Sequence, residues 1–263
     1  MATFLSFPQT PVLVGMVHLD PLPGAPEFGG DMDAVVARAE ADASVLAEAG
    51  FDAVMVENFY DAPFYKDRLP PETVAGLTRC AMAVRAVAPG LRLGINALRN
   101  DGCAALGIAA AVGAEFIRVN VLTGAMVTDQ GLIEGCAADL IRRRRALGLP
   151  IAILADVAVK HAAPLAPLDL VQSARDMVYR GKADALVVSG TGTGQPTSAS
   201  RLATVRQAVP GVPVFVGSGV QAASVDASAA DGFIVGTALK HEGRVELARA
   251  RAMRAAITPA ACS

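Results

Sequence analysis

The stretch VGAEFIRV, residues 112–119, decides the fold. Its glycine ends a helical segment, and a short β-branched and aromatic run follows at once, as at a turn from a helix into a buried strand. The same passage recurs as AGFDAV, LGLPIAIL and RGKADALVV, at residues 49–54, 147–154 and 180–188. A chain that repeats this turn is typical of a parallel α/β sheet.

Outward from these turns, the apolar periodicity predicts eight strands separated by helices. The predicted strands are Val12–Leu19, Asp52–Asn58, Arg92–Leu98, Phe116–Leu122, Ile151–Val157, Ala185–Ser189, Pro213–Gly217 and Gly232–Thr237. The predicted helices are Met32–Ala49, Pro71–Ala88, Asp101–Val112, Gly131–Leu147, Leu168–Arg180, Ser198–Ala208 and Arg244–Ala256, while Gln221–Ala230 leaves room for one or two helical turns. An open doubly wound sheet uses a similar pattern, but eight near-regular units are better satisfied by a closed (β/α)8 barrel.

Composition limits the function classes. The chain has 263 residues, 53% of them hydrophobic and 18% charged, and no linker divides it. We therefore expect one domain over residues 1–263, with a frayed tail at 258–263. A net charge of −2 gives no field that would draw the chain to nucleic acid, and we expect the run Arg142–Arg145 to be solvated helix surface. A small-molecule or protein partner is expected instead.

The chain also lacks the marks of an exported or membrane protein. No apolar run approaches the roughly 20 residues that span a bilayer. The four cysteines stand far apart and suggest neither a zinc site nor a disulfide framework. We expect a cytoplasmic protein. Its apolar content suits a homo-oligomer, although alanine-rich helices explain that content equally well.

Polar residues collect where the predicted strands end, which in a barrel is the rim that carries active sites. They are His18, Glu57, Asn58, Asn96, Arg118, Asn120, Asp156 and Ser189. Arg118 and Asn120 share one face of their strand, and a buried Arg118 needs a carboxylate partner, either Glu57 or Asp156. Glu57 and Asp156 are candidate acid/base groups. Helix capping is an equal alternative for Asn58, Asn96 and Ser189, and a purely structural role is an alternative for Arg118.

Glycine-rich turns after the last three strands suggest an anion site. They contribute Gly190 and Gly192, then Gly217, Ser218 and Gly219, and finally Gly236 and Thr237. Glycines let backbone N–H groups converge on an anion, and the last two strand ends are the recurrent phosphate site of barrels, although glycine also serves plain tight turns. Lys160 and His161 follow the fifth strand and are further catalytic candidates. Lys160 is a cation for the anion or, if desolvated, a base or Schiff-base nucleophile.

The chain resembles the BtpA/SgcQ family, a group of predicted barrels related to ribulose-phosphate-binding barrels. The motifs that carry the resemblance run in order along the chain: GMVHLDPLPGAPEF, VENFYDAPF, GINALRNDGCAAL, FIRVNVLTGAMVTDQGLIEG, ILADVAVKHA, DALVVSGTGTG, GSGV and ADGFIVGTALK. Besides the residues above, the resemblance adds Asp61, Arg99, Asn100 and Asp101 as motif residues. The sequence departs from the family pattern at QAASVDASA, a segment that is shorter than the family's and has Ser224 where asparagine is usual.

The sequence thus predicts an enzyme acting on a small phosphorylated sugar or nucleoside-like compound. Isomerase, aldolase or lyase, and glycosidic hydrolase chemistry all remain open. His18, Glu57 and Asp156 form a candidate divalent-metal site. The resemblance also implies a rival, a non-catalytic assembly factor that binds a protein partner, and a ligand-sensing barrel is a third option.

Overall fold

The computed structural model describes residues 11–157, 162–190 and 197–257. In this part of the chain, eight parallel strands close into a barrel, in the order β1-β2-β3-β4-β7-β9-β10-β11, with β11 paired back to β1. Their bounds are β1 (Val12–His18), β2 (Ala53–Glu57), β3 (Arg92–Asn96), β4 (Phe116–Val119), β7 (Ala152–Val157), β9 (Ala185–Val188), β10 (Val214–Val216) and β11 (Gly232–Val235). The predicted barrel is confirmed, with several strands shorter than predicted.

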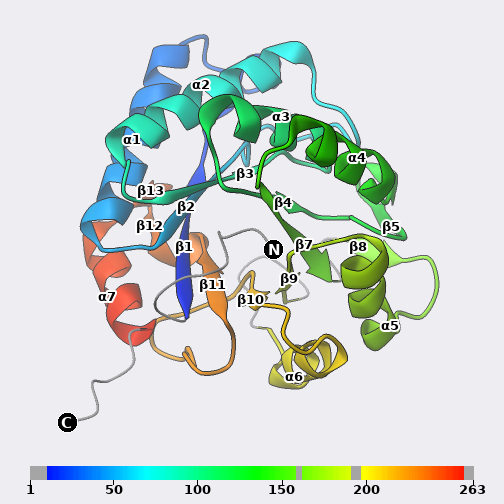
Figure 1. The fold of residues 1–263 in the computed structure, drawn as a ribbon. Helices are drawn as coiled ribbons and strands as arrows, with labels where there is room; N and C mark the ends of the chain where they lie inside the picture. The colour runs from blue at the N-terminus through cyan, green and yellow to red at the C-terminus, as the bar shows by residue number, and fades with distance from the viewer. Residues whose placement is uncertain (1–10, 158–161, 191–196, 258–263) are drawn as a thin grey trace.

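Helices surround the barrel and follow its strands (Figure 1). They are α1 (Met32–Glu48), α2 (Pro71–Val87), α3 (Gly102–Val112), α4 (Ala137–Leu147), α5 (Leu170–Arg175) with its π-helical continuation η2 (Asp176–Arg180), α6 (Ala199–Ala208) and α7 (Leu247–Ile257). Local chemistry fixes their ends: Asp31 caps α1, Asp101 caps α3, and Gly113 and Gly148 end α3 and α4 in the left-handed conformation.

The helix predicted from Gly131 begins six residues later, at Ala137. Residues 131–134 belong to β6 (Gly131–Glu134), which pairs with β5 (Ala125–Thr128), and β5 pairs with β8 (Ala162–Pro164) in a separate three-stranded sheet. The predicted helix Gly131–Leu147 is therefore wrong in its first part. A Cβ on Gly135 would stand 2.7 Å from the Leu122 carbonyl oxygen, so this tight passage separates the strand from α4.

The segment after the last barrel strand is also more elaborate than predicted. A short helical turn, η3 (Thr237–Leu239), leads into the hairpin of β12 (Lys240–His241) and β13 (Arg244–Val245). The final helix consequently starts at Leu247 rather than Arg244. Residues 221–230 form turns without a helix.

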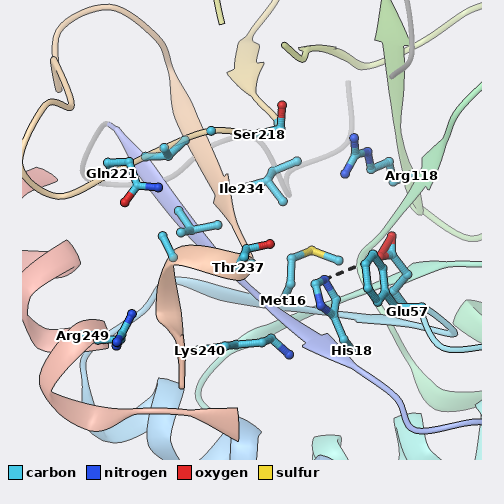
Figure 2. A pocket seen from close by; sticks show the side chains of 17 residues that line it. Met16, His18, Glu57, Arg118, Ser218, Gln221, Ile234, Thr237, Lys240 and Arg249 are labelled. Atoms are coloured by element: carbon cyan, nitrogen blue, oxygen red, sulfur yellow. Dashed lines mark ion pairs between the residues drawn. The ribbon is translucent and has the colours of Figure 1, made fainter. Parts of the chain in front are cut away.

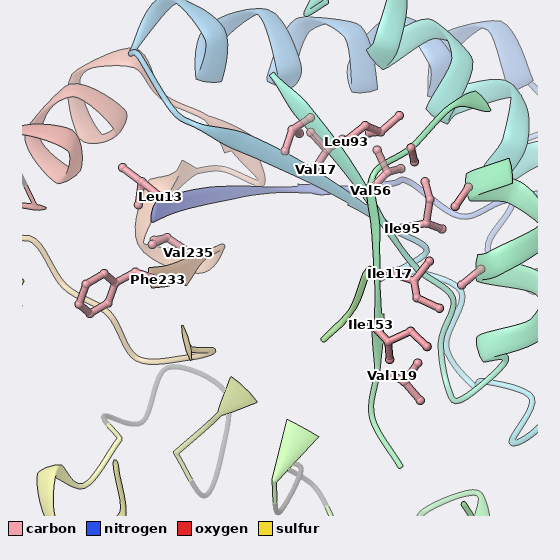
Figure 3. Packing of buried hydrophobic residues seen from close by; sticks show 14 of the residues in the cluster. Leu13, Val17, Val56, Leu93, Ile95, Ile117, Val119, Ile153, Phe233 and Val235 are labelled. Atoms are coloured by element: carbon pink, nitrogen blue, oxygen red, sulfur yellow. The ribbon is translucent and has the colours of Figure 1, made fainter. Parts of the chain in front are cut away.

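Two apolar layers position the site. Inside the barrel, a cluster of inward side chains includes Met16, Met55, Phe116 and Phe215. Gly94 makes room for this layer, since a Cβ there would lie 2.2 Å from the Phe116 ring. A larger cluster lies between the strands and the helices, and Figure 3 shows its outward side chains along β1, β2, β3, β4, β7 and β11. The filled interior leaves only the carboxyl ends of the strands for polar side chains.

Candidate functional site

A row of four polar side chains crosses the barrel rim. His18 on β1 is in register with Glu57 on β2, Glu57 with Asn96 on β3, and Asn96 with Arg118 on β4. Each lies two residues after an interior position of its strand, so the alternation that fills the barrel also turns this row inward. Glu57, Asn96 and Arg118 are at most 6% exposed. The sequence therefore builds a desolvated polar layer above the apolar one.

Glu57 is held at both carboxylate oxygens. Its Oε1 accepts a hydrogen bond of 2.6 Å from Asn96 Nδ2. Its Oε2 lies 3.6 Å from His18 Nε2, and the His18 ring stacks on Phe59 with 4.2 Å between ring centroids. A carboxylate beside an imidazole forms a pair that can take up and release protons.

Arg118 and Asp156 form a second, fully buried group. The guanidinium donates to both Asp156 oxygens, at 3.1 and 2.8 Å, and Asn120 Nδ2 donates to the same carboxylate at 2.5 Å. Burial alone would lower the pKa of Arg118, but the Asp156 charge outweighs it and the pKa is raised. Of the two carboxylates predicted as partners of Arg118, Asp156 is thus the one that pairs. Its occupied oxygens make it a positioning residue.

The glycine turns of β9, β10 and β11 converge beside this group. The Ser218 hydroxyl accepts a 2.9 Å hydrogen bond from the Gly190 amide, which leaves its own proton for another acceptor. A Cβ on Gly217 would meet Val187 at 2.4 Å and Ser189 Oγ at 2.7 Å. Only glycine therefore fits at residue 217, and the strand end stays open above it.

These residues enclose a cavity of about 340 Å³, which Figure 2 shows from close by. Glu57 and His18 line it on one side, and Ser218 and Thr237 come from the glycine turns. The further lining residues are Met16, Phe59, Arg118, Gly217, Gly219, Val220, Gln221, Ile234, Val235, Gly236, Ala238, Lys240 and Arg249. The cavity thus brings a carboxylate–imidazole pair together with hydroxyls and glycine backbone.

Polar atoms near this rim lack partners among the described residues. Asn120 Oδ1 and Ser189 Oγ are buried without a hydrogen bond there, and so is Lys240 Nζ. Buried polar groups in folded proteins are nearly always hydrogen-bonded, so each of these three atoms needs an acceptor or donor from elsewhere.

Lys240 and Arg249 are charged cavity residues that the sequence did not indicate. The Lys240 side chain is 7% exposed, and its ammonium lies 3.7 Å from the Asp42 carboxylate. Burial lowers the pKa of Lys240, while Asp42 and Glu57 counteract the shift. The motif that ends in this lysine was visible at residues 230–240, but nothing local indicated that a hairpin would turn it back over the rim.

Several predicted residues hold the scaffold instead. Asn58 exchanges hydrogen bonds with the Leu98 backbone and donates to Asp61, whose other oxygen accepts from the Leu22 amide. Asn100 pairs with both backbone groups of Val121, and Asp101 caps α3. Burial raises the pKa of Asp61 and lowers that of Arg99. Asn58, Asp61 and Asn100 thus join neighbouring segments at the carboxyl ends of the strands. Lys160, His161 and Gly192 lie outside the described residues.

The candidate metal site of His18, Glu57 and Asp156 is not assembled among the described residues. Among residues 11–157, 162–190 and 197–257, no three His, Cys, Asp or Glu side chains lie close enough to hold a metal ion. Asp156 is turned to Arg118 and Asn120 while Glu57 faces His18, which separates the proposed ligands. In the same part of the chain no helix is long and apolar enough to cross a membrane.

A closed barrel of eight parallel strands with a polar cavity at their carboxyl ends defines a TIM-barrel protein. The chain belongs to the BtpA family, which it matches over residues 9–258. It is 47% identical to the photosystem I biogenesis protein BtpA of Synechocystis over 93% of this chain and 86% of that protein. An uncharacterized protein of Thermococcus kodakarensis is 51% identical over 92% of this chain and 91% of its own.

Solved structures share the fold at low sequence identity. Phosphoribosyl anthranilate isomerase from Thermus thermophilus superposes with a TM-score of 0.57 at 13% identity, over 94% of this chain and 98% of that one. At this identity the likeness shows the barrel and nothing of the substrate.

Proposed function

We propose that the chain is an enzyme that binds a small phosphorylated sugar or nucleoside-like compound in the rim cavity. The observation that carries the proposal is the arrangement of one cavity around Glu57 and His18 on one side and Ser218 and Thr237 on the other. The hydroxyls and the glycine amides are hydrogen-bond donors suited to a phosphate, at the strand ends where barrels recurrently bind one.

In this proposal Glu57 transfers the proton. The hydrogen bond from Asn96 fixes the orientation of the Glu57 carboxylate. His18, 3.6 Å away, would accept a proton from that carboxyl group or return one to it. Arg118 lines the cavity and, held by Asp156, presents fixed positive charge where negative charge develops on the substrate. This set of groups suits isomerisation and carbon–carbon or glycosidic cleavage alike, since each needs proton transfer beside an oxygen that gains charge.

The test compares ligands in pairs that differ only by phosphate, such as ribose and ribose 5-phosphate. A ligand at about 100 times its dissociation constant stabilises the folded state by about 2.7 kcal/mol, which thermal unfolding detects. The double variant Ser218→Ala, Thr237→Val should lose the preference for the phosphorylated member. Glu57→Gln should keep binding and lose turnover, with the exposed Glu48→Gln as the control.

A second candidate follows from the name of the Synechocystis relative: an assembly factor that binds a protein partner. Under that function, Glu57→Gln and the Ser218, Thr237 double variant would retain full activity in assembly. If the folded wild-type chain is stabilised by none of the sugar phosphates, nucleotides or nucleosides, the enzyme proposal fails and the assembly function takes its place.

A further inference from the structure

The proposed anion site needs a cation, and the cations that line the cavity differ in what they already bind. Arg118 is committed to both oxygens of Asp156. Arg249 is about half exposed and donates to Glu246 at 2.7 Å. Lys240 is buried, and no described residue accepts a hydrogen bond from its ammonium. Apart from its 3.7 Å contact with Asp42, its N–H donors are therefore available to a ligand.

The Asp42–Lys240 contact involves one carboxylate oxygen and is long, so it does not saturate that ammonium. At 3.7 Å it is longer than a charge-assisted hydrogen bond, which spans about 2.7–2.9 Å. Asp42 uses its other oxygen, Oδ1, to accept from the Val245 amide at 2.9 Å, and this bond ties α1 to the hairpin. The carboxylate thus holds the hairpin by itself and lies behind the ammonium as a counter-charge.

The ammonium also faces the reactive side of the cavity. Figure 2 shows the Lys240 side chain running below Thr237 with its nitrogen towards His18. Glu57 is close enough to act on the charge of Lys240. A ligand group between the glycine turns and Glu57 would therefore come within reach of this lysine.

We propose that Lys240 is the cationic ligand-binding residue of this site, donating hydrogen bonds to an anionic oxygen of a phosphate or carboxylate on the bound molecule. Asp42 is its positioning residue: it keeps the lysine charged in a buried place and sets the direction of the side chain. The inference rests on the proposed function and assigns its cation to the hairpin after β11, a segment far along the chain from Lys160.

The test measures binding of inorganic phosphate and of ribose 5-phosphate by calorimetry. Lys240→Met should weaken both by about tenfold or more, because hydrogen bonds to charged groups contribute at least that factor. Lys182→Met removes the same charge from an exposed residue between η2 and β9, and should bind like the wild type.

Lys240→Met leaves Asp42 without its counter-charge, which destabilises the folded state. The double variant Asp42→Asn, Lys240→Met removes both charges, and circular dichroism verifies its fold. A folded double variant with weakened phosphate binding supports the role of Lys240. If it binds phosphate like the wild type, the role of Lys240 is refuted and the anion site at Ser218 stands. If the wild type itself binds neither probe, the proposed function fails first.

Discussion

Replacing Arg118 by methionine tests the geometry on which the whole rim depends. The side chains of Arg118 and Asp156 are 4% and 0% exposed, and the substitution removes two of the three hydrogen bonds described for the carboxylate. The carboxylate is left buried with its bond from Asn120. Breaking such a pair costs about 3–5 kcal/mol, a large share of a typical stability of about 5–15 kcal/mol.

The same loss of unfolding free energy can be expressed as a fall in the melting temperature. At about 2–4 °C for each kcal/mol in a chain of this size, the midpoint should fall by about 6–20 °C. Because the chain contains no tryptophan, urea and thermal unfolding are best followed by far-UV circular dichroism. The pKa of Arg118 is raised, so its contribution is fully present below the ordinary arginine pKa and is lost only at higher pH. The loss should therefore be equal at pH 7 and pH 9.

A matched control separates burial from pairing. Arg251 lies 2.9 Å from Glu48 with side chains 61% and 57% exposed, and Arg251→Met should cost about 0–1 kcal/mol. The double variant Arg118→Met, Asp156→Asn should recover part of the loss, since no uncompensated charge remains. If Arg118→Met and Arg251→Met lower the free energy of unfolding by equally small amounts, the Arg118–Asp156 pair is not the buried, mutually dependent pair that the structure shows.

Two further predictions concern packing and thiol chemistry. Gly94→Ala should destabilise the barrel by about 1–3 kcal/mol, since its Cβ would stand 2.2 Å from the Phe116 ring, whereas Gly107→Ala, on an open face of α3, should stabilise it by about 0.5–1 kcal/mol; urea unfolding that gives both changes the same sign contradicts this packing. Burial raises the pKa of Cys80 and of Cys136 to about 12, so neither should react with a thiol reagent at pH 8 until guanidinium unfolds the chain. Peptide mapping assigns the reacting thiols, and rapid labelling of either one in the native protein is the opposing result.

The barrel was predictable because the sequence patterns that specify its strands and turns are local. Each strand is a short apolar run entered through a turn, and the two-residue alternation that filled the interior also placed Glu57 and Arg118 on the lumen side. The alternation equally explains why Asn58 does not face the cavity. It follows Glu57 directly, so its side chain points away and bonds to the Leu98 backbone.

What the sequence did not reveal depends on contacts between distant segments. The β5 strand pairs both with its neighbour β6 and with β8, thirty-odd residues further on, and no local pattern specifies such a partner. The buried position of Lys240 similarly depends on its ion pair with Asp42, which lies on the first helix. Its burial is a product of the hairpin β12–β13, whose two-residue strands are too short to read from periodicity.

The buried ammonium of Lys240 bears on the choice between an enzyme and an assembly factor. It lines the cavity and makes no close hydrogen bond to any described residue, and a buried group in that state costs about 1–3 kcal/mol. A protein that only offers its outer surface to a partner gains nothing from that cost inside its barrel mouth. A protein that takes a polar molecule into the cavity recovers it on binding. The interior of the rim, rather than any feature of the outer helices, therefore favours a ligand, and a ligand beside Glu57 favours chemistry.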